Sequence, residues 1–421
     1  MRILYCGSDE FSIKVLQSLM NQKNIQVEVL GPSNKILKEK RESSIYVPSI
    51  VRYCNNNNIP YVQSIDVLKD KIINKKYDAL VAVSFNKFIK ASLLNYFTYN
   101  FNLHPSLLPF YKGSSPIQRS LINNEKYIGI TIQAIDSEKF DNGKIYMQTK
   151  PLLVSDLTNK NYMLSNVEYV YDKNKTDEIC LNEDDRDYRF SKIMEPNSKK
   201  FNYKYDYLRN SLAMISGDLM KEFFSKQIYN CHTTNTNDFI QYLPFKQPFF
   251  AKKINNSTFQ LNWLKESIST LVNKVNITDD CCYSYVKEIY TKNDMTLWRP
   301  RKVFFRNVNI FRDSSPFLIE EKVGSFRLFN NNLLVKCANN QVLQVNELKP
   351  EGAKTFITPQ EFFLTKFKKL YKHQIYLFNT IKEIREEYEN NLSKIQIDKT
   401  IEAIIYENSK KKKNCVETLH I

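Results

Sequence analysis

The chain is 421 residues long, which allows roughly two or three domains and a sizeable buried core. Its 61 Lys and Arg residues outnumber 45 Asp and Glu, and this net charge of +16 indicates a polyanionic partner such as nucleic acid, although drift toward a Lys-rich composition would give the same balance. Apolar runs are too short to cross a membrane, which argues against a membrane protein. The eight cysteines lack regular CxxC spacing, which argues against a zinc site and a disulfide framework. Met1-Arg2 leads straight into an apolar strand, which argues against a signal or transit peptide.

Strands and helices alternate along the first 85 residues. Strands are predicted at 2–7, 25–30, 61–62 and 79–85, with helices over about 10–20, 48–57 and 66–74 between them. This order predicts a mostly parallel, doubly wound α/β sheet of five or six strands. The first turn holds a single glycine and no GxGxxG motif, which argues against a dinucleotide site.

A basic segment without apolar periodicity interrupts this alternation at residues 32–44. It is predicted to be a loop, and it carries Lys35, Lys38, Lys40 and Arg41. Taken alone, these charges fit a solvated surface loop better than a binding site.

Three polar residues between positions 100 and 143 could form a reaction centre. Asn102 and His104 lie two apart in a short strand, so both side chains leave on the same face, and Asp141 lies in a polar loop after the strand 129–135. The amide can donate to an oxyanion, the imidazole can donate or relay a proton, and the carboxylate can fix the imidazole tautomer. No Ser or Cys is placed as a covalent nucleophile, which indicates direct attack of a substrate on a carbonyl. A structural histidine beside an Asn turn explains the same spacing equally well.

The remainder divides into an excursion, a helix, a β-rich part and a tail. Residues 157–203 lose periodicity and gather acidic side chains, so we expect an inserted loop or a partly disordered segment; a helix follows at 205–224. Segment 272–289 fits neither helix nor strand. Short strands at 303–305, 324–327, 333–337 and 341–345 predict a small antiparallel barrel. The expected domains are 1–235, 245–365 and a helical, Lys-rich tail over 366–421.

The stretch FNLHPSLLPFYKG, residues 101–113, resembles the signature of the 10-formyltetrahydrofolate-dependent formyltransferases. Of three enzymes in that superfamily, SSPIQRSL at 114–121 is most similar to the methionyl-tRNA formyltransferases rather than to the glycinamide ribonucleotide enzyme or the folate hydrolase/dehydrogenase. Two distant segments, 249–263 and 341–363, resemble the opening and the end of the C-terminal domain of the tRNA enzyme. The likeness covers about residues 1–156 and 205–365.

The resemblance implies a Rossmann-like formyltransferase domain joined to an OB-like barrel that holds tRNA, with 10-formyltetrahydrofolate as cosubstrate and no metal. By the motif, Asn102, His104 and Asp141 match the catalytic triad. The folate-binding positions are implied to be Phe85, Asn86, Lys87, Phe88 and Ile89 at the pterin pocket, with Asn86-Lys87 departing from the usual Gly and apolar residue, and Ser106, Leu107, Leu108 and Pro109 in the loop. The basic segment with Lys35, Lys38, Lys40 and Arg41 occupies the position of the tRNA-inserting loop of the family.

The expected reaction is transfer of the formyl group of 10-formyltetrahydrofolate to the amino group of methionyl-initiator-tRNA, by a monomeric enzyme without membrane attachment. Family resemblance implies the mitochondrial matrix, with the cytoplasm as the alternative because no transit peptide is visible. Two alternatives stay open: a formyltransferase acting on a small amine such as a nucleotide or sugar amine, and a non-catalytic RNA-binding protein that retains the fold.

Overall fold

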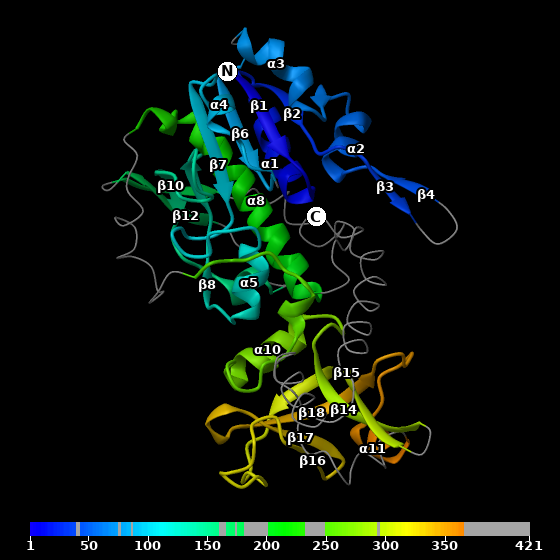
Figure 1. The fold of residues 1–421 in the computed structure, drawn as a ribbon. Coiled ribbons are helices and arrows are strands. Elements are labelled where there is room, and N and C mark those ends of the chain that lie inside the picture. Colours follow the sequence, from blue (N-terminus) through cyan, green and yellow to red (C-terminus); the bar gives the residue numbers. More distant parts are fainter. Residues whose placement is uncertain are drawn as a thin grey trace.

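The computed structural model describes residues 1–38, 43–74, 77–85, 87–159, 166–172, 175–180, 201–231, 249–292 and 295–365. Two sheets dominate this part of the chain, one built from its N-terminal half and one from its C-terminal half (Figure 1). The predicted helical tail, 366–421, lies outside the described residues.

The first sheet has nine strands in the order β13-β12-β10-β9-β7-β6-β1-β2-β5. Its strands β7, β6, β1, β2 and β5 run parallel, and the four beyond β7 are antiparallel to their neighbours. The bounds are β1 Arg2–Gly7, β2 Gln26–Leu30, β5 Tyr61–Val62, β6 Ala79–Val83, β7 Tyr99–His104, β9 Thr131–Ala134, β10 Ile145–Thr149, β12 Asn166–Asp172 and β13 Lys175–Cys180. The mostly parallel α/β sheet is therefore confirmed, with more strands than the five or six expected.

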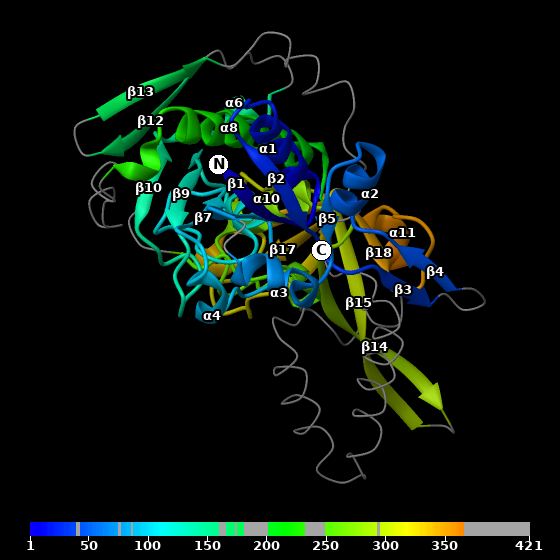
Figure 2. The ribbon, with the colours of Figure 1, turned by 90° about the horizontal axis from the view of Figure 1, so that it is seen from above.

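Helices cover both faces of this sheet, as the doubly wound pattern predicts. The odd-numbered residues of β1, Ile3 and Tyr5, pack in one core with α1 and α8, and the even-numbered Leu4 and Cys6 pack in a second core on the α3 and α4 side. Figure 2 shows α8 beside α1. The helices of the first sheet are α1 Glu10–Met20, α2 Ser49–Asn56, α3 Ile65–Ile73, α4 Ala91–Leu94, α5 Pro116–Ile122, α6 Val154–Leu157 and α8 Tyr203–Ser225, with the short η2 Ile228–Asn230.

Local chemistry explains how the first helix begins. Asp9 accepts a hydrogen bond from the Ser12 amide, and the Ser12 hydroxyl receives the Asp9 amide in return, which is a capping box. Asp9 is therefore the N-cap of α1.

Two hairpins replace predicted loops. β12 and β13 lie inside the 157–203 excursion and extend the sheet beyond β10. Their alternation is present but short, with Val167 and Tyr169 buried between exposed residues, and the surrounding acidic side chains hide it. The basic segment likewise begins as the hairpin β3 Lys35–Lys38 and β4 Ser43–Tyr46, which pairs Ile36 with Ile45. The loop prediction is wrong for these residues.

The second sheet is antiparallel throughout, in the order β14-β15-β18-β17-β16. Its strands are β14 Tyr283–Lys292, β15 Met295–Ile310, β16 Phe326–Phe329, β17 Asn332–Lys336 and β18 Val342–Pro350. The helices η3 Asn256–Phe259 and α10 Ile268–Ile277 precede these strands, η4 Ala338–Asn340 connects β17 to β18, and α11 Pro359–Thr365 follows β18. The predicted strands near 303, 326, 333 and 342 are confirmed, whereas α10 and β14 were not foreseen in segment 272–289. Two further short strands, β8 Tyr127–Ile128 and β11 Leu152–Leu153, pair with each other.

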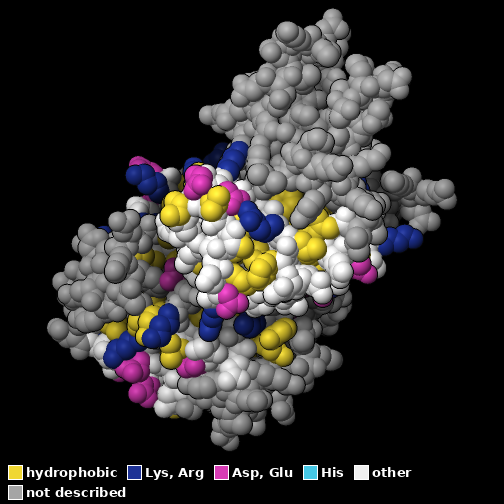
Figure 3. All heavy atoms as spheres, turned by 90° about the horizontal axis from the view of Figure 1, so that it is seen from below, with side chains coloured by type: hydrophobic (Ala, Val, Ile, Leu, Met, Phe, Trp, Pro, Cys, Tyr) yellow, Lys and Arg dark blue, Asp and Glu magenta, His cyan; other side chains and the backbone are white. Residues whose placement is uncertain are grey.

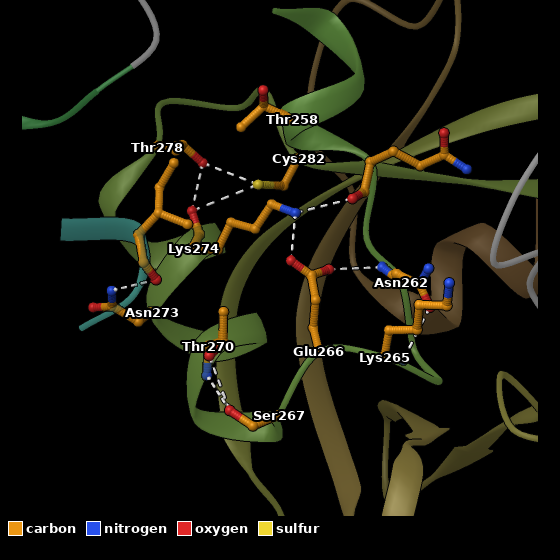
Figure 4. A network of polar contacts seen from close by, with 12 residues as sticks. Thr258, Asn262, Lys265, Glu266, Ser267, Thr270, Asn273, Lys274, Thr278 and Cys282 are labelled. Carbon is orange, nitrogen blue, oxygen red and sulfur yellow. Dashed lines mark hydrogen bonds and ion pairs between the residues drawn. The ribbon is translucent and has the colours of Figure 1, made fainter. Parts of the chain in front are cut away.

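A polar network anchors α10 where the two sheets meet (Figure 4). The buried ammonium group of Lys274 donates to the Gln260 carbonyl at 2.9 Å and to Glu266 at 2.8 Å. The Asn273 amide donates to the carbonyls of Leu121 and Ile122 in α5. The partners of Lys274 compensate a buried charge that would otherwise be strongly destabilising. The hydrogen bonds of Asn273 hold α10 against α5. None of the described helices is both long and apolar enough to span a bilayer.

Candidate active site

Strand pairing brings the predicted polar residues to one edge of the first sheet. β7 and β9 are antiparallel neighbours in which Asn102 pairs with Gln133 and His104 pairs with Thr131. Side chains of directly opposed residues leave a sheet on the same face. The Asn and His therefore share that face with Gln133, and the loop between β9 and β10 carries Asp141 back to them.

Asp141 is the hub of this cluster. Its Oδ1 accepts hydrogen bonds from the side-chain amides of Asn102 and Gln133, each at 3.1 Å, and lies 3.4 Å from Nδ1 of His104. Its Oδ2 accepts the backbone N–H of Gly113 at 2.8 Å. Its side chain is 9% exposed, so these donors take the place of water around the carboxylate.

His104 is held on both sides of its ring. Nε2 lies 2.9 Å from the carbonyl oxygen of Tyr111, which can only accept, so Nε2 carries a proton. The contact from Nδ1 to Asp141, at 3.4 Å, is longer than the ~2.7–2.9 Å of a strong charge-assisted bond. A small movement would thus let Nδ1 turn to another partner, while the Tyr111 carbonyl keeps the ring in place.

One cation lies beside the cluster. Lys112 donates to the side chain of Asn142 at 2.7 Å. Burial lowers the pKa of Lys112, and the carboxylates of Asp141 and Asp136 oppose that effect. Its ammonium group offsets the negative charge of the loop that carries Asp141.

The loop after His104 lies within the core. Ser106, Leu107 and Leu108 are buried, and the Leu108 amide and carbonyl are bonded to Thr131 and Gln148. The Ser106 hydroxyl donates to the Phe110 carbonyl at 2.7 Å, and the Leu108-Pro109 peptide bond is cis. These contacts make residues 106–109 a scaffold behind Asn102 and His104, and the folate assignment of their side chains stays a prediction.

The segment after β6 reaches the same site from the other side. Phe88 is exposed and its ring packs edge-on against the exposed ring of Phe140, with centroids 5.1 Å apart. Phe140 directly precedes Asp141, so this aromatic pair lies at the mouth of the cluster. Phe85 and Ile89 turn toward the core, Lys87 is exposed, and Asn86 lies outside the described residues.

The basic hairpin is described only in part. Lys35 is half-buried, the backbone of Lys38 ends β3, and Lys40 and Arg41 lie outside the described residues. Burial and the neighbouring ammonium group of Lys253 lower the pKa of Lys35. This places the base of the hairpin close to the segment that leads into the second sheet.

Sequence reasoning missed Gln133, Tyr111 and Gly113. Gln133 had a signal, since it is a polar residue in an otherwise apolar alternating strand and would face the same way as Asn102. Tyr111 and Gly113 act on the cluster through backbone groups, so their side-chain chemistry gives no sign of this role.

Residues 1–168 match the family model described as formyl transferase. The chain is 23% identical over 378 residues to the mitochondrial methionyl-tRNA formyltransferase of Saccharomyces cerevisiae, covering 84% of this chain and 86% of that protein. It is 31% identical over 159 residues to the methionyl-tRNA formyltransferase of Carboxydothermus hydrogenoformans, covering 38% of this chain and 51% of that protein, so the chain matches about half the length of this bacterial relative.

Among solved structures, an N-formyltransferase from Helicobacter canadensis aligns with 82% of this chain and 98% of its own at 14% identity and a TM-score of 0.44, a likeness too low to discriminate between substrates. The expected resemblance to the formyltransferases is confirmed by the family match and the two relatives. Residues 1–168 of the chain are therefore similar to the formyl transferase family.

Proposed function

We propose that the protein transfers the formyl group of 10-formyltetrahydrofolate to the amino group of methionyl-initiator-tRNA. The single observation that carries this proposal is the Asp141 cluster, in which an amide, an imidazole and a carboxylate meet at one strand end of a formyl transferase domain. The likeness to a methionyl-tRNA formyltransferase across 84% of the chain supports the acceptor.

In the proposed mechanism, the neutral amine of the acceptor attacks the formyl carbonyl directly. An α-amino group has a pKa of about 7.7–8.0, so little activation is required. The Asn102 amide has two N–H groups, and one of them donates to Asp141. The second is directed to the developing oxyanion, and Nδ1 of His104, when the ring carries a second proton as an imidazolium, joins it by leaving its long contact with the carboxylate. Asp141 orients both groups and receives the proton that the amine loses, through water where needed; that proton passes to N10 of the folate as the bond between N10 and the formyl carbon breaks.

Some of the residues expected to bind the formyl donor are accessible to it, and others are buried. The exposed rings of Phe88 and Phe140 offer an apolar surface for a flat heterocycle next to Asp141. The side chains of Leu107 and Leu108 offer no such surface, because both are buried. 10-Formyltetrahydrofolate would supply the activated formyl group, with residues 87–89 and Phe140 holding its ring. No metal takes part in the proposed reaction.

A cationic and aromatic surface on the second sheet supports a nucleic-acid acceptor. Tyr285 pairs with Lys302 across β14 and β15, and Phe304 pairs with Lys349 across β15 and β18, so these four side chains share a face. The Lys349 ammonium lies 5.6 Å from the Phe304 ring and 4.7 Å from the Phe356 ring, whereas Lys302 is largely buried and Arg306 is paired with Asp280 and Glu347. Interleaved cations and rings suit phosphates and unstacked bases.

Figure 3 views the molecule from the side of the second sheet and shows Lys and Arg side chains beside hydrophobic ones. The basic hairpin adds charge from the first domain, where the ammonium group of Lys253 acts electrostatically on Lys35. Lys38, Lys40 and Arg41 would extend this charge along the hairpin.

The proposal includes the domain organisation and the cellular site. A catalytic domain over 1–235 would be followed by an OB-like tRNA-binding domain over 245–365, consistent with the separate antiparallel sheet, and by the Lys-rich tail over 366–421. A monomer in the mitochondrial matrix is proposed, since the yeast relative is named as mitochondrial.

One assay separates the acceptors. Purified protein and 10-formyltetrahydrofolate are offered methionyl-initiator-tRNA, glycinamide ribonucleotide or an amino-sugar nucleotide, and formylated product is measured. We expect product only with the tRNA, and a fall of about 10²–10³-fold in Asn102→Ala, which loses an oxyanion donor. Product only with a small amine would support the alternative acceptor, and none with any amine would support a non-catalytic RNA-binding protein.

A further inference from the structure

A three-residue loop, Tyr111 to Gly113, touches both ionisable members of the Asp141 cluster. The Tyr111 carbonyl accepts from Nε2 of His104 at 2.9 Å, and the Gly113 N–H donates to Asp141 at 2.8 Å. The positions of both catalytic side chains therefore depend on where this loop lies.

The opposite side of the same loop is bonded to residues 249–251, at the start of the segment that leads into the second sheet. The Tyr111 N–H donates to the Phe249 carbonyl at 2.7 Å, and the Ala251 N–H donates to the Lys112 carbonyl at 2.7 Å. The ring of Phe249 packs against that of Tyr111 with centroids 5.0 Å apart. Residues 249–251 thus pair with the loop like a short parallel strand, as the bridge between Lys112 and Phe250 shows.

One peptide group connects the two sets of contacts directly. The Lys112 carbonyl and the Gly113 N–H belong to the same planar unit, so the bond from Ala251 and the bond to Asp141 lie at its two ends. Hydrogen bonds in such a chain polarise and strengthen one another. A shift of Ala251 would therefore move the donor on which the Asp141 carboxylate rests.

The loop needs external support to keep its shape. Tyr111 has a φ of 58°, a left-handed conformation that costs a non-glycine residue about 1–3 kcal/mol. Gly113 has a φ of 120°, and a Cβ there would come within 2.6 Å of the Ala251 carbonyl oxygen. The close approach of residue 251 is thus built into the loop, and only glycine allows it.

We propose that Phe249 and Ala251 are positioning residues, which set the geometry of His104 and Asp141 through the loop 111–113. The catalytic site is complete only when the segment that opens the second domain is docked. This inference rests on the proposed function for its kinetic readout. It goes beyond that function by coupling the part of the chain that would hold tRNA to the reacting groups.

The test compares two rings of similar exposure. Phe249→Ala removes the ring that packs on Tyr111, whereas Phe329→Ala removes a ring of β16 that is 41% exposed and packs on Phe311. We expect kcat to fall about tenfold in the first variant with both KM values within about twofold, and about twofold or less change in the second. Phe249→Tyr, which keeps the ring, should retain wild-type kcat. A merely structural role for Phe249 would lower thermal stability without this selective loss of kcat.

A matched pair of glycines supplies a second arm. Gly113→Ala adds a Cβ against Ala251, and Gly352→Ala adds one at a second positive φ, 84°, with nothing within 4 Å. Only the first should lower kcat, by about 100-fold, because its Cβ also displaces the donor to Asp141. If Phe249→Ala unfolds, Phe249→Leu keeps an apolar contact and serves in its place.

A readout that needs no activity distinguishes this inference from the proposed function. The chain has four histidines, so the ring nitrogens of His104 can be followed by ¹⁵N NMR. Phe249→Ala should weaken the signal of the Nε2–H bonded to Tyr111, and Phe329→Ala should not. A wild-type protein without tRNA formylation would overturn the proposed function alone. Unchanged His104 signals and kcat in a folded Phe249→Ala protein would overturn this inference.

Discussion

Replacing Asp141 by Asn tests the cluster at its hub. The carboxylate accepts Asn102 and Gln133 at one oxygen and Gly113 at the other, and an amide can replace only one of these oxygens. If the new NH₂ group faces Gly113, two donors oppose each other at 2.8 Å; if it faces the other way, it opposes the two side-chain amides and His104. Either orientation also removes the negative charge beside His104.

The magnitude follows from two losses. An unsatisfied buried donor costs about 1–3 kcal/mol, and a hydrogen bond to a charged group contributes about 1.5–3 kcal/mol. Their sum, about 3–6 kcal/mol, would correspond to a factor of about 10²–10⁴ if it fell entirely on the transition state. We expect kcat for formylation of methionyl-tRNA to fall within that range.

The matched control is Asp136→Asn in the same loop. Asp136 accepts the backbone N–H groups of Glu138 and Lys139 and makes no hydrogen bond to Asn102, His104, Gln133 or Asp141, so kcat should change by about threefold or less. Initial rates with saturating methionyl-tRNA and 10-formyltetrahydrofolate give kcat, and thermal unfolding checks that both variants are folded. A folded Asp141→Asn protein with kcat within fivefold of wild type would refute the role given to this carboxylate.

Three further predictions concern the second donor, the cationic surface and acid stability. Gln133→Leu should lower kcat about tenfold with little change in Tm, because the amide donates to Asp141 while its Oε1 has no partner among the described residues; a large drop in Tm would show a structural role instead. Lys349→Ala should weaken initiator-tRNA binding and reduce the slope of log Kd against log salt by about 1, measured by filter binding; an unchanged slope would remove this face from the binding surface. The pKa of Asp78 is lowered by the hydrogen bond from the Arg2 N–H and by the Arg2 side chain, so its stabilising effect is present at neutral pH and is lost as pH falls through its folded-state pKa. Asp78→Asn should therefore lower unfolding free energy by about 1 kcal/mol or less at pH 7 and by nothing at the acid end, and a constant difference across pH would contradict this linkage.

The sequence predicted the first sheet well because its signals are local and strong. Buried runs such as 79–83 and helix starts such as Asp9 depend on a few adjacent residues. The hairpins β12–β13 and β3–β4 were not predicted because charged side chains hide their short alternation. In addition, β12 is stabilised by pairing with β10, which its own sequence does not reveal. The long strand β15 was recognised only around 303–305, where its apolar residues cluster.

In the candidate site, the residues that act through side chains could be predicted from the sequence, and those that act through backbone groups could not. Asn102, His104 and Asp141 could be predicted because their side chains carry the chemistry and a short motif fixes two of them. Gly113 and Tyr111 could not, since their backbone groups act through contacts with Phe249 and Ala251, more than 130 residues later in the chain. A motif records which side chains react, but not what holds them.

This difference bears on how the acceptor would control the reaction. Lys35 belongs to the first domain and Lys253 lies two residues beyond Ala251, yet the two ammonium groups influence each other. A tRNA that contacts both the basic hairpin and the segment 249–253 would hold the two together, and residues 249–251 of that segment are bonded to the loop under His104 and Asp141. A small amine makes no such contact. Binding energy from a part of the tRNA remote from the methionyl group would then be expressed at the reacting atoms, as a higher kcat rather than a lower KM.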